Sequence, residues 1–315
     1  MSDILPFPNQ AASYERMGRK ELETGAYLEA VAHLEKAYEL EANWERNRLL
    51  VSAYIEAAQP EEALILANEY ITDYLQEEEG FAQYISVLVH NRKLMKAHIL
   101  VRNARLSKTL EKELTEQLAS LDQTLLTINK TEIQATQTWL KKQATSSLYS
   151  HLFYQKLESL PIAAFAETSQ YLISQATTLP IYRRYILEQA VRLKLTADWS
   201  IYLYDGTRQT FSLPSLVPFP EQQHVQMLQA CLYELIGEDY QYHDLQEILR
   251  LYLSTIYPKA WPEYLNMEIW LICFLSTYLP EMSERKAKLD VDLKPYETHI
   301  NEIKKVLEQN EHLDK

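Results

Sequence analysis

Glycine and cysteine are both scarce in this chain. Only five of its 315 residues are glycine, and they are too dispersed to form a phosphate-binding loop. Their scarcity also favours helix over loop-rich folds. Cys231 and Cys273, the only two cysteines, lack the spacing of a metal site or a disulfide scaffold. Because isolated thiols are typical of a reducing compartment, we expect a cytoplasmic protein.

Long apolar runs are also missing. The longest, residues 269–279, is too short to cross a bilayer and is typical of a buried helix. The first ten residues lack the basic segment and the apolar stretch of a signal peptide. We therefore expect no membrane partner and no export signal.

The sequence contains none of the common motifs of catalysis or metal binding. Its eight histidines are scattered, with no H-E-x-x-H motif or Cys/His pairing, and there is no G-x-S-x-G. Neighbouring acids such as Glu61 and Glu62 stand at expected helix starts, where they complement the helix dipole. We therefore expect no metal, no cofactor and no enzyme, although catalytic groups that converge only in space leave no such motif.

An alanine recurs at a fixed spacing in the first third of the chain. Ala30, Ala63 and Ala97 are separated by 33 and 34 residues, and each lies in an apolar helical run after a polar lead-in. A small residue at such a position lets two helices cross closely. Gly18, one helix before Ala30, would permit the same close approach. The spacing predicts three helix pairs over residues 11–110.

This pattern resembles the tetratricopeptide repeat (TPR), a helix–turn–helix unit of about 34 residues. The first repeat matches the family's signature most fully. The matching residues are Tyr14, Met17, Gly18, Ala30, Leu34 and Ala37 in the first repeat, Leu50, Tyr54 and Ala63 in the second, and Phe81, Leu88, Ala97, Val101 and Ala104 in the third. The resemblance implies stacked helix pairs with a concave protein-binding surface. Unrelated helical hairpins with a chance spacing are the alternative.

We therefore expect an all-α fold in three parts. Residues 1–110 would form three TPR-like helix pairs, residues 111–197 further helical hairpins that could be degenerate repeats, and residues 198–315 a helical domain with one β-hairpin. A leucine stripe from Leu110 to Ile128 predicts one long helix. That helix would either cap the third repeat or pair with another chain.

The hairpin is predicted by Asp205-Gly206, a turn dipeptide between aromatic and β-branched residues. Residues 200–204 would pair with residues 207–211. Further helices are expected over residues 131–146, 148–159, 162–177, 181–195, 221–236, 240–257, 262–279 and 294–311. The order of repeats, hairpin and helical tail resembles that of uncharacterised bacterial cytoplasmic TPR proteins.

In TPR proteins the first helix of each pair lines the concave groove. By this register the resemblance implies ten groove residues: Glu15, Arg19, Glu23, Glu45, Arg48, Ser52, Glu56, Glu79, Ser86 and His90. Five of them are carboxylates and two are arginines. Because charge complementarity selects partners, we expect a neutral or basic peptide over an acidic one.

Some TPR proteins hold a partner's C-terminal carboxylate in a clamp of Lys, Asn and Arg. This chain has Glu15 and Arg19 at the first clamp pair, Leu49 at the Asn position, and Glu79 and Gln83 at the last pair. That departure argues against an acidic-tail ligand. The resemblance implies a non-catalytic scaffold that binds a protein or peptide, and it leaves a homo-oligomer open.

Basic residues gather in the middle of the chain, although its net charge is −13. The segment 91–110 has six Lys and Arg and no Asp or Glu, and its basic patch comprises Arg92, Lys96, Arg102 and Arg105. The first two would share one helix face and the last two another. A second basic helix contains Arg183, Arg184, Arg192 and Lys194.

Two alternative functions follow. One is a regulator whose basic middle contacts nucleic acid, although the acidity of the whole chain argues against a nucleic-acid partner. The other is an enzyme with a site near residues 195–220.

Overall fold

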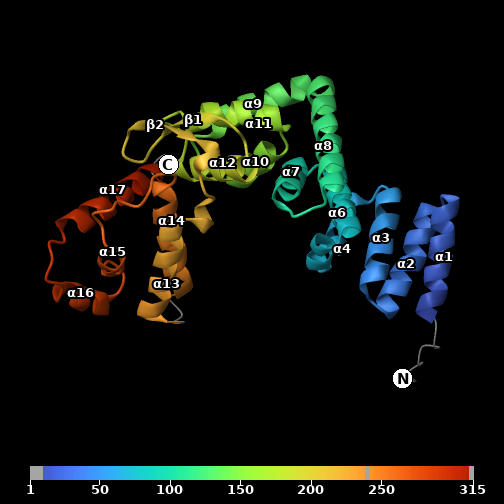
Figure 1. Ribbon diagram of the computed structural model, residues 1–315, viewed down its shortest axis with the longest axis horizontal. Coiled ribbons are helices and arrows are strands. Elements are labelled where there is room, and N and C mark those ends of the chain that lie inside the picture. The colour runs from blue at the N-terminus through green and yellow to red at the C-terminus, as the bar shows by residue number, and fades with distance from the viewer. Residues whose placement is uncertain (1–9, 238–241, 312–315) are drawn as a thin grey trace. The chain divides into compact units, whose positions relative to one another are not determined.

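Figure 1 shows the computed structural model, which describes residues 10–237 and 242–311. The chain divides into two compact units, Met1–Leu125 (unit 1) and Leu126–Lys315 (unit 2). The N-terminal segment that lacks signal-peptide features, up to residue 9, lies outside the described residues, as does the start of the helix predicted over 240–257.

Every regular element that the structure describes in unit 1 is a helix. The elements are α1 (Gln10–Thr24), α2 (Tyr27–Leu40), α3 (Trp44–Glu56), α4 (Pro60–Glu69), α5 (Ile71–Gln76), α6 (Glu78–His90), α7 (Leu94–Asn103) and α8 (Lys108–Ile128), within which the division falls. Local chemistry explains two helix starts. The Asn43 side chain accepts a hydrogen bond from the Arg46 amide at 2.9 Å, which caps α3. Pro60 opens α4, where no amide donor is needed.

The recurring alanines lie in the core of unit 1. Ala30, Ala63 and Ala97 are each 0 % exposed, and α1 packs on α2, α3 on α4, and α6 on α7. A Cβ on Gly18 would lie 2.5 Å from Cγ of Leu34, so only glycine fits this approach of α1 to α2. The three helix pairs predicted from the spacing are therefore present.

The second pair contains a bend that the sequence analysis did not predict. The chain leaves helical geometry at Tyr70, and the short helix α5 follows before α6 begins. The bend carries Tyr74 into the core, where its ring meets Trp44 edge-on with centroids 4.5 Å apart. The Tyr74 hydroxyl donates to Oδ1 of Asn47 at 3.1 Å, so this buried phenol has a polar partner.

Helix α8 covers one end of the core of unit 1. Leu114 and Leu118 are buried, and Leu110, Leu121 and Leu125 pack against the same core as half-buried residues. At the end of the stripe Ile128 is 74 % exposed. The leucine stripe therefore packs within the chain, as the capping interpretation expects.

Unit 2 contains helices and one β-hairpin. Its elements are α9 (Lys130–Gln143), α10 (Ser150–Glu158), α11 (Ile162–Ile173), α12 (Pro180–Arg192), β1 (Asp198–Tyr202), β2 (Arg208–Ser212), the 3-10 turns η1 (Leu213–Ser215) and η2 (Phe219–Glu221), α13 (Gln223–Ile236), α14 (Tyr242–Ile256), α15 (Met267–Leu275), α16 (Pro280–Ala287) and α17 (Lys294–Glu311). The predicted helices are present among the described residues. Helix α16 was not predicted, because only Met282 of its eight residues is buried and no apolar stripe marks it.

The hairpin is confirmed, but β1 and β2 both lie farther from the turn than the predicted strands. Ser200 pairs with Thr210, and Tyr202 pairs with Arg208. Leu203 already belongs to the turn, because its amide donates to the Thr207 carbonyl at 2.8 Å. Gly206 has a φ of +77°, a left-handed conformation that glycine adopts readily. The described chain is thus an all-α fold with a single two-stranded antiparallel sheet.

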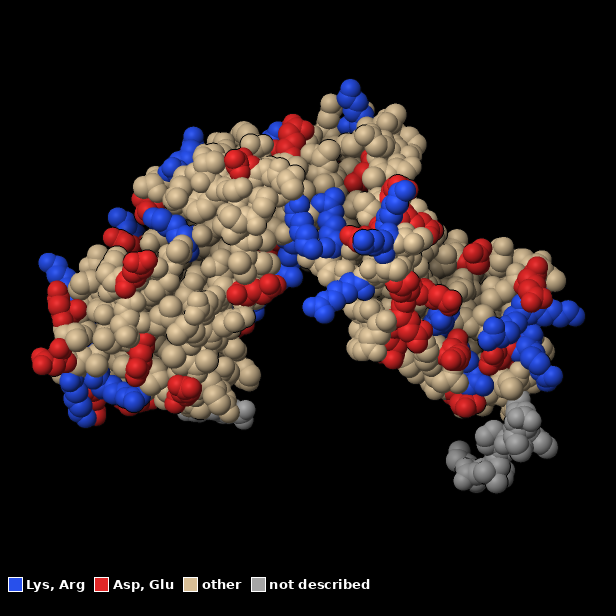
Figure 2. Space-filling view, viewed as in Figure 1, with Lys and Arg blue, Asp and Glu red and all other residues tan. Residues whose placement is uncertain are grey.

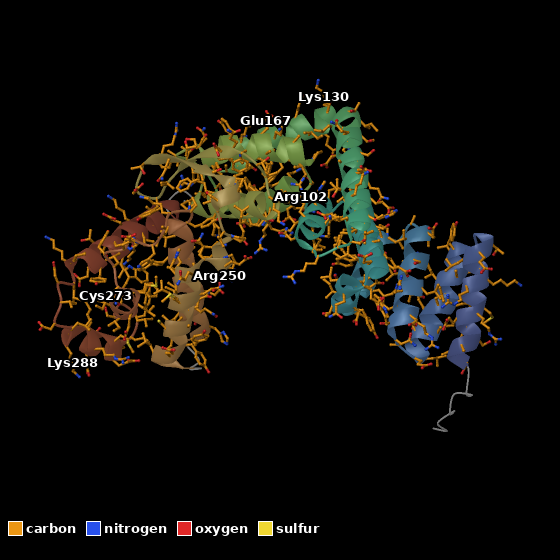
Figure 3. The ribbon with its side chains drawn as sticks, viewed as in Figure 1. Arg102, Lys130, Glu167, Arg250, Cys273 and Lys288 are labelled. Carbon is orange, nitrogen blue, oxygen red and sulfur yellow. The ribbon has the colours of Figure 1, made fainter. Side chains whose placement is uncertain are left out.

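Aromatic rings fill much of the core of unit 2. Phe153 and Tyr182 stack with centroids 3.9 Å apart, and Trp199 and Trp270 are buried. Cys273 is buried within α15 (Figure 3). None of the helices in the described part of the chain has the length together with the hydropathy that crossing a membrane requires.

Candidate functional site

Two arginines contact Glu15 on the helix face predicted to line a groove. Oε1 of Glu15 accepts from Nη2 of Arg19 at 2.8 Å, and Oε2 accepts from Nε of Arg46 at 3.0 Å, which links α1 to α3. Burial raises the pKa of Glu15, but the hydrogen bonds and charges of both arginines outweigh it, so the pKa lies below its ordinary value. Arg46 is only 8 % exposed, and no motif marks it in the sequence.

A second polar bridge joins α3 to α6. Nε of Arg48 donates to Oε1 of Gln83 at 3.2 Å, and Nη2 contacts Oε2 of Glu79 at 3.4 Å. Nε2 of Gln83 in turn donates to the Arg48 carbonyl at 2.8 Å and to Oγ of Ser52 at 2.9 Å. The Arg48 guanidinium also lies over the ring of Trp44, 5.4 Å from its centroid. The structure thus brings Arg48, Ser52 and Glu79 together.

The remaining groove residues are not brought into either bridge. Ser86 and His90 lie one turn apart at the end of α6, with His90 Nδ1 2.8 Å from the Ser86 carbonyl. Glu23, Glu45 and Glu56 are exposed, and within the described part of the chain no ion pair joins them to a base. On the face shown in Figure 2, acidic side chains gather over α3, α4 and α6.

The basic patch is not one surface. Arg92 lies in the turn before α7, where its φ is +57°, so the prediction that it shares a helix face with Lys96 is wrong. Nζ of Lys96 donates to the hydroxyl of Tyr84 at 3.2 Å. The predicted face of Arg102 and Arg105 is also wrong, because α7 ends at Asn103 and leaves Arg105 in the following loop.

Arg102 differs from the other members of the patch in its burial. It lies on α7 (Figure 3) and is half-buried. Burial lowers the pKa of Arg102, and the charge of Asp122 on α8 partly offsets that effect.

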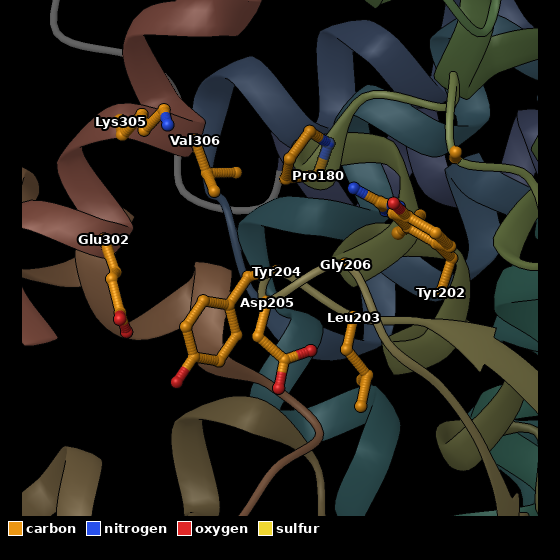
Figure 4. A pocket seen from close by; sticks show the side chains of 11 residues that line it. Pro180, Tyr202, Leu203, Tyr204, Asp205, Gly206, Glu302, Lys305 and Val306 are labelled. Atoms are coloured by element: carbon orange, nitrogen blue, oxygen red, sulfur yellow. The ribbon is translucent and has the colours of Figure 1, made fainter.

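Unit 2 contains a pocket with a volume of about 430 Å³ beneath the tip of the hairpin (Figure 4). The turn from Tyr202 to Gly206 and Pro180 at the start of α12 line it (Figure 4). Arg183, one turn further along α12, also lines the pocket. Helix α17 contributes Glu302, Lys305 and Val306 to the lining. The lining combines apolar side chains with the charged groups of Arg183, Asp205, Glu302 and Lys305. Concave sites on which a few polar groups converge are the usual binding sites of small molecules.

Arg183 is the half-buried cation of this pocket. Its guanidinium lies over the ring of Tyr202, 5.3 Å from the centroid, and its Nη1 contacts the Gln175 carbonyl at 3.5 Å. Burial lowers the pKa of Arg183 to about 10, and the charge of Tyr202 partly offsets the shift. The other two arginines of α12 have a carboxylate partner, because Arg184 and Arg192 both pair with Glu188.

A hydrogen-bonded chain runs from the core of unit 2 to this pocket. Nε1 of Trp270 donates to Nδ1 of His299 at 3.0 Å, and Nε2 of His299 lies 3.3 Å from the Tyr204 hydroxyl. Because an indole N–H only donates, Nδ1 accepts and the ring proton of neutral His299 is on Nε2. Burial, with a smaller contribution from Lys259, lowers the pKa of His299 to about 4.

The carboxylate at the hairpin tip is fully engaged. Asp205 Oδ1 accepts from the amide and the hydroxyl of Thr207 at 3.0 and 2.6 Å, and Oδ2 pairs with Nζ of Lys259. Burial raises the pKa of Asp205, but Lys259 and Thr207 together lower it below its ordinary value. Asp205 is therefore not the partner of Arg183.

Neither site has the composition of a metal centre. Among the described residues, no group of three His, Cys, Asp or Glu side chains could hold a metal ion.

No protein-family model matches the chain, and no curated protein or solved structure matches it either.

Proposed function

We propose that this chain is a non-catalytic scaffold of the TPR kind, which binds a neutral or basic segment of another protein along α1, α3 and α6. The spacing and burial of Ala30, Ala63 and Ala97 support the repeat register. The proposal includes a cytoplasmic location like that of the bacterial TPR proteins it resembles. Two free cysteines are compatible with that compartment.

The pairing of the arginines on this face carries the proposal. Arg19 is paired with Glu15, and Arg48 contacts Gln83 and Glu79, so an incoming carboxylate would have to compete with these internal partners. The side chain of Glu79 is nevertheless 87 % exposed. Together with the exposed Glu23, Glu45 and Glu56, it gives the face an outward negative charge, which favours a basic partner.

Calorimetric titration with three peptides of equal length, one lysine-rich, one neutral and one ending in an acidic tail, tests the proposal. We expect the lysine-rich or the neutral peptide to bind more tightly than the acidic one. The double variant Glu45→Lys with Glu56→Lys should lower the affinity for the lysine-rich peptide. Glu61→Lys with Glu62→Lys makes the same charge change on α4 and is the matched control.

The opposite selectivity would contradict the proposal. Preferred binding of the acidic tail, lost in Arg19→Ala or Arg48→Ala, would show that these arginines leave their internal partners to hold a carboxylate. Failure of all three peptides to bind, at concentrations well above those of typical peptide ligands, would also argue against a peptide groove on this face.

A further inference from the structure

We propose that the pocket beneath the hairpin of unit 2 binds a small organic anion, with Arg183 holding its carboxylate or phosphate group. This inference concerns another part of the chain and does not depend on the scaffold function of unit 1. It starts from a half-buried guanidinium with a weak internal partner. Among the described residues, the one hydrogen bond of the Arg183 side chain is the 3.5 Å contact with the Gln175 carbonyl.

Nearby carboxylates do not neutralise this guanidinium. Asp205 is engaged by Lys259 and Thr207. Glu302 lines the same pocket from α17, but in the described part of the chain it forms no ion pair with Arg183. A charge that is partly removed from water is costly unless it is paired, so Arg183 is well prepared to receive an anion.

The ring of Tyr202 orients the guanidinium. The Arg183 guanidinium lies over this ring, 5.3 Å from its centroid. The N–H groups of a guanidinium share one plane, and two of them can bind one carboxylate or phosphate group. The neighbouring arginines show the contrast. Arg184 and Arg192 both pair with Glu188, whereas Arg183 lines the pocket and forms no ion pair with a carboxylate among the described residues.

The size and the walls of the pocket indicate the rest of the ligand. A volume of about 430 Å³ is within the usual range for small-molecule sites. Pro180 and Val306 supply apolar contacts, and Lys305 adds a second cation beside the carboxylate of Glu302 at the α17 side. This mixed lining fits a compact organic body that carries one anionic group.

Calorimetric titration of the full chain with benzoate, phenyl phosphate and inorganic phosphate, and with benzamide as the neutral shape control, tests the proposal. We expect benzoate or phenyl phosphate to bind, and the stronger of the two identifies the preferred anionic group. Benzamide should bind at least roughly tenfold more weakly, because it lacks the charge-assisted hydrogen bonds. Inorganic phosphate should also bind more weakly, because it cannot use the apolar contacts of Pro180 and Val306.

Arg183→Gln should lower the affinity for the probe by roughly 10- to 100-fold, the range expected for losing hydrogen bonds to a charged group. Arg184→Gln, which changes the neighbouring arginine paired with Glu188, should leave probe affinity unchanged. Binding that is equal for benzoate and benzamide, or binding that Arg183→Gln does not alter, would overturn the proposal.

Thermal unfolding without probe separates a binding role from a structural one. Since Arg183 is weakly paired and partly desolvated, Arg183→Gln should unfold at the same or a higher temperature than the unmodified chain. A clear fall in unfolding temperature, together with no binding of any probe to the unmodified chain, would show that Arg183 is structural and would sink the proposal.

Discussion

At the scale of single residues, the buried alanines of unit 1 leave no space for a larger side chain. Ala30 and Ala63 are each 0 % exposed. Replacing either with leucine should overpack the helix crossing and lower the free energy of unfolding by about 1–3 kcal/mol. Chemical denaturation followed by circular dichroism measures the change.

Ala32→Leu is the matched control for that experiment, because Ala32 lies on α2 and is exposed. It should change the free energy of unfolding by less than about 0.5 kcal/mol. If the two buried sites tolerated leucine equally well, the repeat register drawn from the alanine spacing would be wrong.

His299 should make the stability of unit 2 depend on pH. Its pKa in the folded chain is about 4, and the ordinary value is 6.5. Between these values the unfolded chain binds more protons, so the stabilisation is complete above about pH 6.5 and is lost as the pH falls towards 4. The total loss should be about 3 kcal/mol, at 1.36 kcal/mol per pKa unit.

Urea unfolding at about pH 7 and about pH 5 measures the part of this loss that falls above pH 5, about 2 kcal/mol. His299→Gln should flatten the pH dependence, because glutamine can accept the Trp270 hydrogen bond without titrating. His151→Gln, on the exposed start of α10, should leave the dependence as it was. A pH dependence that survives in His299→Gln would assign the loss to other groups.

The roles of some of these residues can be predicted from the sequence, and the roles of others cannot. Gly18 and the alanines follow from the repeat spacing, because a close helix crossing demands small side chains wherever it occurs. Arg46 and Arg183 do not, since their roles depend on which groups the fold brings near them. Arg183 and Arg184 are adjacent arginines on one basic helix, and only the structure shows that Glu188 engages Arg184 and not Arg183.

At the scale of helices and strands, α8 is the helix whose apolar stripe completes the core of unit 1. Leu118 is 2 % exposed, whereas Ile128 at the end of the same stripe is 74 % exposed. Leu118→Ala should lower the free energy of unfolding by about 2–5 kcal/mol, through lost burial and a cavity. Ile128→Ala removes a similar side chain from the surface and should have little effect.

Chemical denaturation at several protein concentrations completes this test. A cap within the chain predicts an unfolding midpoint that does not depend on concentration. If the midpoint rose with concentration, and Ile128→Ala abolished that rise, then α8 would be pairing with a second chain, the alternative that its leucine stripe left open.

Periodic elements were predictable, and the elements shaped by local bonds were not. The apolar stripe of α8 repeats with a helical period, which can be read from the sequence without knowing what the helix packs against. The bend at Tyr70 has no such signal, and α16 has almost no apolar face. The strands of the hairpin end early because Thr207 bonds both to Leu203 and to the Asp205 side chain, which lengthens the turn.

At the scale of the whole molecule, charge argues against tight binding of nucleic acid. The net charge is −13, and the members of the basic patch have separate surroundings. We expect no sub-micromolar binding of duplex DNA or single-stranded RNA at physiological salt, which filter binding over a salt series measures. A tight affinity that falls by roughly 0.9 log units per phosphate contact for each log unit of salt, and that needs Arg92, Lys96, Arg102 and Arg105, would contradict this expectation.

The extent of unit 1 also depends on packing that the repeat pattern does not contain. The register of the repeats fades at residue 110, but the compact unit continues to Leu125. The reason is that Leu114 and Leu118 belong to its core. Sequence periodicity thus locates the repeats, while the tertiary contacts of α8 determine how far the unit extends.

The position of Trp44 gives the proposed peptide face its own optical reporter. The other tryptophans, Trp139, Trp199, Trp261 and Trp270, all belong to unit 2. The half-buried Trp44 indole contacts both the Arg48 guanidinium and the ring of Tyr74. A ligand that displaces Arg48 or covers the ring would change the polarity around the indole, so the difference between the emission spectra of the unmodified chain and of Trp44→Phe would report occupancy of this face without any added dye.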